Sequence, residues 1–206
     1  MLIIAAIGLP VSKAQADTII SRSFDLPIPS PDEPSAPLGL GRMADAFIDV
    51  EQHFSIVDLD IAISLTHEAF MDLEMVLQGP DGTKITLNSA LNDAFWIKAP
   101  GGAYSVGGEN RFLFDDEAPL GIVDAVPPFD QAFRPKDGFK LSAFDGQDAF
   151  GRWCLQIYDA GDDNIGRLEA VELIITTPEP ATALLLCLGV SLAPLLKSRK
   201  LHRPSR

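Results

Sequence analysis

Apolar and polar residues alternate along several short stretches of this chain, as they do in strands that bury one face. Trp153, Leu155 and Ile157 stand at every second position, and Val171, Leu173 and Ile175 repeat the pattern. Between the two stretches lies DAGDDNIG, whose Asp and Gly residues are typical of a turn. This period of two predicts strands over 151–159 and 168–176, each with one face in a core.

A second region has the same pattern. Val57, Leu59, Ile61, Ile63 and Leu65 alternate with smaller or acidic residues, and Leu73, Met75 and Leu77 resume the alternation after a break at 67–71. Gly-Pro-Asp-Gly at 79–82 then supplies a tight turn, since Pro fixes φ and Gly permits positive φ. We predict strands over 54–65, 72–78 and 84–88.

The remaining patterns are weaker. We predict further strands over 17–24, 46–50, 111–114 and 139–144, and irregular chain over 90–108 and 119–135. Five prolines between 25 and 41 oppose regular pairing and favour an extended segment along a sheet edge. No amphipathic helical pattern occurs between 17 and 177, so the predicted class is all-β.

The order of certain residues resembles the P domain, or P/Homo B domain, which lies beside the catalytic domain in furin-like and kexin-like proprotein convertases and many bacterial subtilisin-type proteases. The positions that carry the resemblance are His67, Asp72, Leu73, Leu77, Pro80, Gly82, Thr83, Leu87, Phe114, Asp115, Asp116, Phe144, Gly146, Gly151, Trp153, Leu155, Asp159, Gly166 and Leu168. The resemblance implies a jelly-roll-like antiparallel β-sandwich of about eight strands.

The N-terminal residues 1–16 are typical of a signal peptide. Their apolar run from Leu2 to Val11 ends in Ala14-Gln15-Ala16, which predicts cleavage after Ala16. The alternative is that this run forms a buried first strand. On the signal-peptide interpretation, residues 17–177 are the exported domain.

Residues 178–206 contain three parts in order: Pro178-Glu179-Pro180, an apolar stretch at 181–196, and a basic tail with five cations and no acid. As a helix the 16-residue stretch measures about 24 Å, which spans a bilayer core of about 30 Å with local adjustment. The basic tail places this end in the cytoplasm. The order resembles the PEP-CTERM sorting signal of Gram-negative bacteria, whose partner is an exosortase. An ordinary tail anchor is the alternative.

These signals predict anchoring in the inner membrane facing the periplasm, followed by release to the cell surface or medium.

Residues 17–177 hold 10 Lys and Arg against 28 Asp and Glu, a net charge of −18. Such a charge repels nucleic acid and anionic membrane surfaces, so neither is an expected partner. Cys154 lies in a predicted strand and Cys187 in the predicted membrane span, so we expect no disulfide between them.

The sequence offers no catalytic machinery. No G-x-S-x-G or other serine elbow is present, and Cys154 between Trp153 and Leu155 has the surroundings of a core residue. His67 falls within the P-domain pattern, where packing or turn hydrogen bonding is its expected role. We therefore predict a protein that is not an enzyme.

Calcium is the one cofactor that the sequence suggests, because it binds several oxygen ligands on turns. One acidic loop contains Asp115, Asp116 and Glu117, and another contains Asp159, Asp162, Asp163 and Asn164. The hypothesis takes Asp115, Asp116, Asp159 and Asp162 as ligands. The alternative is that these residues only build turns.

The resulting prediction is an exported, non-catalytic P-domain protein that acts as a protein-interaction or protease-stabilising module. Its partner would be a protease, an envelope component or the extracellular matrix. Two alternatives stay open: an accessory to, or fragment of, a subtilisin-like serine endopeptidase system, and a carbohydrate-binding module. For the latter, Phe95, Trp96 and Tyr104 are the candidate stacking residues.

Overall fold

The computed structural model describes residues 15–32, 41–89, 111–125, 129, 131–136, 138–161 and 163–178. The chain divides into two units, and the larger one, Asp17–Thr177, contains the regular structure described below. Among the described residues every regular element is a strand or a short 3₁₀ helix, so the predicted all-β class is confirmed.

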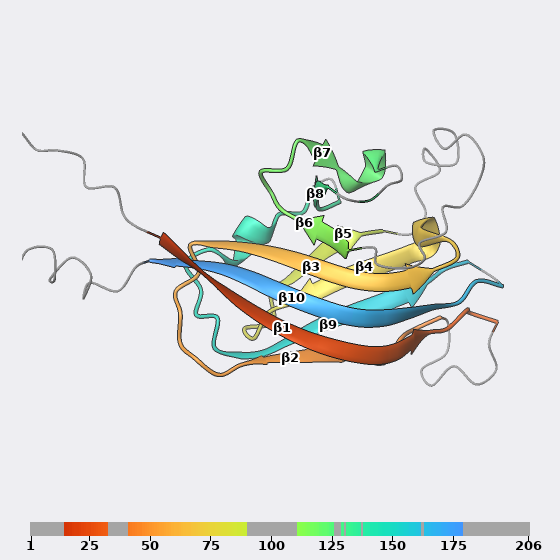
Figure 1. Ribbon diagram of the computed structural model, residues 1–206, viewed down its shortest axis with the longest axis horizontal. Coiled ribbons are helices and arrows are strands. Elements are labelled where there is room, and N and C mark those ends of the chain that lie inside the picture. The colour runs from red at the N-terminus through yellow and green to blue at the C-terminus, as the bar shows by residue number, and fades with distance from the viewer. Residues whose placement is uncertain are drawn as a thin grey trace, which may run out of the picture. The chain divides into compact units, whose positions relative to one another are not determined.

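Two sheets stack face to face, and Figure 1 shows β1, β10 and β3 lying across β2, β9 and β4. In the described part, the six-stranded sheet has the order β1 (Gln15–Ile28), β10 (Gly166–Pro178), β3 (Asp58–His67), β6 (Arg111–Phe114), β8 (Ala132–Arg134), β7 (Leu120–Gly121). The four-stranded sheet has the order β2 (Ala46–Val50), β9 (Gly151–Asp159), β4 (Leu73–Gln78), β5 (Lys84–Asn88). The arrangement is a β-sandwich.

The core lies between the sheets and is built from the alternating positions of the sequence. In β3 the buried side chains include Leu59, Ile61, Ile63 and Leu65, and β4, β9 and β10 bury their own alternating apolar residues against them. Trp153 is fully buried, packs 4.9 Å from the Phe144 ring and donates from Nε1 to the Ala149 carbonyl at 2.9 Å. The apolar surface of the indole is thus buried, and its single N–H donor is hydrogen-bonded.

The register of β10 contains one irregularity. Its pairing with β3 shifts between Leu168 and Ala170, which is the geometry of a β-bulge. Because of this shift, Leu168 and Val171, three positions apart, both face the core. β10 starts at Gly166, before the predicted start at Leu168, and the bulge keeps Leu168 on the core face.

Three expectations about the elements are wrong. Residues 139–144 do not form a strand, because Leu141–Phe144 is the 3₁₀ helix η3. The 119–135 region is not wholly irregular, since it contains β7, the 3₁₀ helix η2 (Ile122–Asp124) and β8. Pairing is not purely antiparallel either, because β8 pairs in parallel with both β6 and β7.

The proline-rich segment also departs from expectation. β1 continues through Pro27 to Ile28 instead of ending at Phe24. An edge strand tolerates proline, because one of its sides needs no ladder donor, and β1 is the edge of its sheet. The expected break after Leu65 is likewise later, since β3 ends at His67 and is followed by the 3₁₀ helix η1 (Phe70–Asp72).

Candidate functional site

His67 and Asp159 form a buried pair at the end of the sandwich where β3 and β9 finish. Both side chains are fully buried, and His67 Nε2 lies 3.1 Å from Asp159 Oδ2. His67 Nδ1 accepts the backbone N–H of Ala69 at 3.1 Å, so that nitrogen carries no proton. The imidazole is therefore the neutral Nε2–H tautomer and donates to the carboxylate.

The rest of this network comes from the neighbouring turns. Asp159 Oδ1 accepts the Gly161 N–H at 2.9 Å, so both of its carboxylate oxygens have protein donors. Asp72 accepts from Asn164 Nδ2 at 3.2 Å, and its pKa is raised by burial first and by the Asp159 charge second. We refer to His67, Asp72, Asp159 and Asn164 as the His67 network. It joins the ends of β3 and β9 to the starts of β4 and β10.

Both nitrogens of His67 are engaged in hydrogen bonds that hold this turn structure. The expected structural role is the one its geometry supports. Within the described residues, no serine or cysteine hydrogen-bonds to His67.

A second histidine, His53, lies on the surface. Its Nδ1 is 2.6 Å from Asp148 Oδ2, its ring stacks on Phe150 at 4.1 Å, and the hydrogen bond to His53 lowers the pKa of Asp148. Ser55 lies beside them around an open hollow of about 270 Å³. Ser, His and Asp are the residue types of a hydrolytic triad, but in the described structure no hydrogen bond joins Ser55 to His53. No local pattern predicted the His53–Asp148 contact, because the two residues are 95 positions apart.

Cys154 is buried but does not face the core. The alternation of β9 directs Trp153 and Leu155 inward and Cys154 to the outer face of the four-stranded sheet, where it is 7% exposed. Burial raises the pKa of its thiol to about 11, so the thiol stays protonated and unreactive at neutral pH.

Acidic side chains gather at the opposite end of β3 from His67. Asp115 and Asp116 follow β6, and their neighbours on β3 are Asp58 and Asp60. The pKa of Asp60 is raised to about 7, chiefly by burial and then by the charges of Asp115 and Asp58. The pKa values of Asp58, Glu117 and Asp145 are also raised, with burial the largest cause for each. We call Asp58, Asp60, Asp115, Asp116, Glu117 and Asp145 the acidic pole.

Two residues of the acidic pole already have structural partners. The Asp116 carboxylate accepts the backbone N–H groups of Leu141 at 3.0 Å and Ser142 at 2.9 Å, and so caps η3. Asp115 Oδ1 accepts the Glu117 N–H at 2.6 Å, which forms a tight turn. In contrast, Asp60 Oδ1 is buried and has no hydrogen-bond partner in the described part of the chain.

The two acidic loops that were predicted to hold calcium, one or both, lie at different ends of β3. Asp115 and Asp116 belong to the acidic pole, while Asp159 belongs to the His67 network at the other end of β3. Asp162 lies outside the described residues. No group of three or more His, Cys, Asp or Glu among the residues described is arranged to hold a metal ion. Calcium binding stays a prediction. Asp58 and Asp60 are two further carboxylates near Asp115 that were not predicted as ligands, because the sequence pattern places them in a strand and not in a loop.

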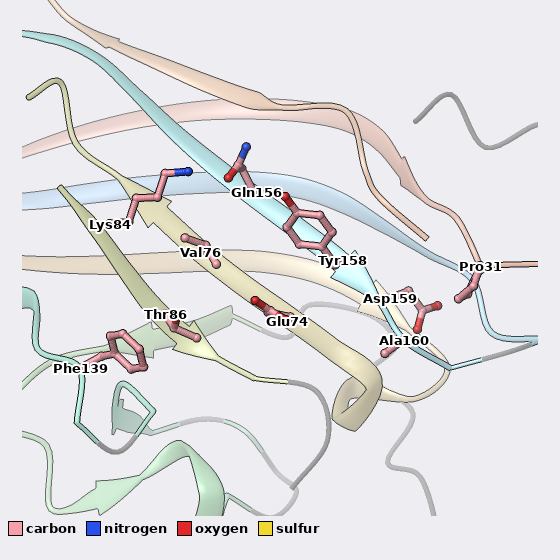
Figure 2. A pocket seen from close by; sticks show the side chains of 10 residues that line it. All are labelled: Pro31, Glu74, Val76, Lys84, Thr86, Phe139, Gln156, Tyr158, Asp159 and Ala160. Carbon is pink, nitrogen blue, oxygen red and sulfur yellow. The ribbon is translucent and has the colours of Figure 1, made fainter. Parts of the chain in front are cut away.

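An open groove of about 590 Å³ crosses the outer face of β9, β4 and β5. Figure 2 shows side chains from all three strands around it, with Tyr158 on one side and Phe139 on the other. The remaining lining residues are Pro31, Glu74, Val76, Lys84, Thr86, Gln156, Asp159 and Ala160. We call it the sheet groove. Apart from Asp159, which was predicted as a calcium ligand, none of its residues was singled out as a ligand contact from the sequence, because only the fold places them together.

The predicted terminal signals fall largely outside the described residues. Pro178 is the last residue of β10, while Glu179, Pro180, the 181–196 stretch and residues 1–14 are not described. In the described portion no helix is long and apolar enough to cross a membrane. Phe95, Trp96 and Tyr104 also lie outside the described residues.

No known protein-family description matches this chain, and no curated protein matches it. Two solved structures resemble its fold. One contains the serine protease of Aeromonas sobria with the chaperone ORF2, with 13% identity, a TM-score of 0.47, and coverage of 85% of this chain and 29% of that one. The other is the Aeromonas sobria serine protease, with 14% identity, a TM-score of 0.45, and coverage of 84% and 28%. This chain thus spans less than a third of either.

Proposed function

We propose that this chain is a non-catalytic P-domain module that is exported and that binds and stabilises a separate protein, with a protease as the first candidate. The observation that carries the proposal is the His67 network. Residues of the P-domain pattern that are distant in sequence, His67, Asp72 and Asp159, converge there and are used for structure. A jelly-roll arrangement of the sandwich is the finer fold that goes with this proposal.

The state of the nucleophile and base candidates supports a binding role over a catalytic one. His67 has both nitrogens engaged, and the Cys154 thiol is protonated. His53 pairs with Asp148 but has no hydrogen bond to Ser55 in the described structure. A serine hydrolase needs that bond so that the imidazole can take the hydroxyl proton.

Export and sorting are proposed from the sequence signals alone. Residues 1–16 would direct the chain across the inner membrane, with cleavage after Ala16. Pro178-Glu179-Pro180, the 181–196 span and the basic tail would then present it to an exosortase-type enzyme, which delivers it to the surface or the medium.

Immunoprecipitation of the full chain from native envelope and secreted fractions tests the binding role. An antibody against residues 17–177 should recover one co-purifying protein in near-equal amount, and mass spectrometry would identify it. If the recovered protein is an extracellular protease, the first candidate is supported. If it is a matrix or envelope protein, the general protein-binding role is supported but the protease is not the partner. Recovery of the chain alone under gentle conditions contradicts the proposal.

A proteolysis assay on the purified full chain tests the non-catalytic part. We expect no cleavage of unfolded casein. Cleavage that survives purification and is abolished by Ser55→Ala or His53→Ala, with Glu51→Gln as the control, would show that the chain is itself a hydrolase.

A further inference from the structure

The sheet groove has polar side chains that no other part of the described structure uses. Glu74, Lys84 and Thr86 line it, and no hydrogen bond or ion pair joins the side chain of any of the three to a described residue. Charged neighbours on the same sheet face differ in this respect. Arg42 pairs with Asp45 at 2.8 Å, and Arg152 pairs with Asp49 at 2.8 Å. The groove therefore presents side-chain donors and acceptors that are solvent-accessible and free of partners among the described residues, whereas Arg42 and Arg152 are engaged in ion pairs.

Aromatic rings flank these polar groups. Tyr158 projects from β9, and the guanidinium of Arg42 lies 5.6 Å from its ring centre, which fixes the ring against the sheet. Phe139 lies across the groove in the loop before η3, and 41% of it is exposed. The exposed Phe139 ring, and the face of the half-buried Tyr158 ring that Arg42 does not cover, offer flat apolar surfaces at low cost in conformational entropy.

The charge of the lining is balanced within an acidic body. Lys84 and Glu74 carry opposite charges, and the Asp159 charge is buried and bonded to His67. Residues 17–177 have a net charge of −18, and part of that excess lies in the acidic pole, on the other sheet. A neutral ligand matches this lining, whereas an anionic polymer would be repelled by the whole body.

The backbone at the floor of the groove does not favour an extended peptide, whereas β5, which lines one side of the groove, is the edge strand of its sheet in the described structure. β4 forms the floor and is paired on both sides, with β9 and with β5. Its N–H and C=O groups are thus used within the sheet, and none is left for the added-strand pairing by which sheets capture peptides. On the β4 floor, recognition has to use side chains, and sugar rings offer the matching chemistry of apolar C–H faces edged by hydroxyls.

We propose that the sheet groove binds a short segment of neutral polysaccharide. Sugar faces stack on Tyr158 and Phe139, while hydroxyl groups bond to the side chains of Glu74, Lys84 and Thr86 and to the side-chain carbonyl oxygen of Gln156. The volume of about 590 Å³ lies in the usual range for small-ligand sites, about 300–1,000 Å³. This site is separate from Phe95, Trp96 and Tyr104, and the proposal is independent of the protein-binding role.

Affinity electrophoresis of the full chain tests the proposal. The chain is run in native gels that contain a β-glucan, a mannan, a xylan or the acidic polymer polygalacturonate. A polyoxyethylene detergent keeps the chain in solution, because a detergent with a sugar headgroup would compete for the site. We expect at least one neutral polymer to retard the chain and polygalacturonate to leave it unaffected.

Variants localise the binding. Phe139→Ala and Tyr158→Ala should each weaken binding about ten-fold, as loss of one stacking contact predicts. Tyr158→Phe keeps the ring and should retain most of the affinity. Phe150→Ala is the matched control, because Phe150 is similarly exposed, at 46%, but stacks on His53 away from the groove. Circular dichroism and melting curves verify that each variant is folded.

Several results would overturn the proposal. These are the absence of retardation by every neutral polymer, retardation by polygalacturonate alone, and equal weakening by Phe150→Ala and Phe139→Ala. Competition by unstructured peptide at the same site, with no polysaccharide bound, would show that the groove recognises protein instead.

Discussion

Asp159 is a buried carboxylate whose negative charge is stabilised by hydrogen bonds from two described groups. Its two oxygens accept from His67 and from the Gly161 backbone, and the side chain is fully buried. A buried charge that loses a partner is strongly destabilising, because the low-dielectric surroundings do not replace the missing donor. His67 is thus a stabilising residue of the sandwich.

His67→Ala should lower the free energy of unfolding by about 3–5 kcal/mol, since it leaves the Asp159 charge with one donor fewer. The surface histidine is the control: His53→Ala should change stability by less than about 0.5 kcal/mol. Urea unfolding followed by tryptophan fluorescence measures both. Equal effects of the two substitutions would show that burial of the pair contributes little.

Asp60 makes stability depend on pH in a defined direction. Its pKa is raised from 3.8 to about 7, so between these values the folded chain holds a proton that the unfolded chain has released. This contribution is complete below pH 3.8 and is lost as the pH rises through about 7. Asp60→Asn should therefore flatten the decline in Tm over that interval and raise Tm above it.

Melting curves across this pH range measure the effect. About 1 kcal/mol corresponds to about 2–4 °C in a domain of this size, so a gain of a few degrees is expected. Glu169→Gln, on the exposed side of β10, should leave the profile unchanged. A slope that survives in Asp60→Asn would assign the pH dependence to other carboxylates.

At the scale of elements, strands with alternating apolar residues could be predicted from the sequence, whereas elements held by contacts between distant residues could not. The bounds predicted for β2, β5, β6 and β9 are those observed, because alternation over these stretches follows from one buried face. η3 was predicted as a strand. Its first turn is held by the Asp116 carboxylate, a contact across about 25 positions that no local pattern reveals.

Other differences have similar causes. β7 and β8 have two and three residues, too few to display a period, and their parallel pairing depends on the tertiary fold. The sheet groove could not be predicted either, since β9, β4 and β5 bring residues 74 to 158 together only after pairing. The buried roles of His67 and Trp153 were predictable, because the P-domain pattern and the alternation point to them.

The turn between β9 and β10 requires a glycine at the first position of β10. A Cβ on Gly166 would lie 2.4 Å from His67 Cδ2 and 2.4 Å from the Thr66 carbonyl oxygen. Gly166→Ala should therefore destabilise the fold by about 1–3 kcal/mol through steric overlap. Gly121→Ala is the control, because its Cβ would meet nothing closer than 3.7 Å and its φ is −78°. Thermal unfolding of both variants decides, and similar Tm values would exclude the overlap.

At the scale of the whole molecule, charge is distributed unevenly. Carboxylates of the acidic pole raise one another's pKa values, while arginines of the four-stranded sheet pair with their acidic neighbours. A divalent cation at the acidic pole would relieve this repulsion. The calcium hypothesis therefore has its clearest test there.

Calcium at 100 times its dissociation constant should stabilise the full chain by about 2.7 kcal/mol relative to chelator. Asp115→Asn should abolish that gain if the acidic pole is the site, and Asp162→Asn should abolish it if the second loop is. Glu51→Gln, an exposed carboxylate outside both loops, should retain the response. Identical melting midpoints in calcium and in chelator would end the hypothesis.

The position of β1 beside β10 has a consequence for biosynthesis. Among the described strands, the first in sequence pairs with the last, so the outer edge of the larger sheet cannot close until nearly all of residues 15–178 have been made. Until then β10's place next to β3 is empty and a row of backbone groups is available for wrong pairing. Non-local closure of this kind slows folding. A chain truncated before Gly166 should consequently still depend on a holding chaperone after export, whereas the full chain should depend on one only until it is exported.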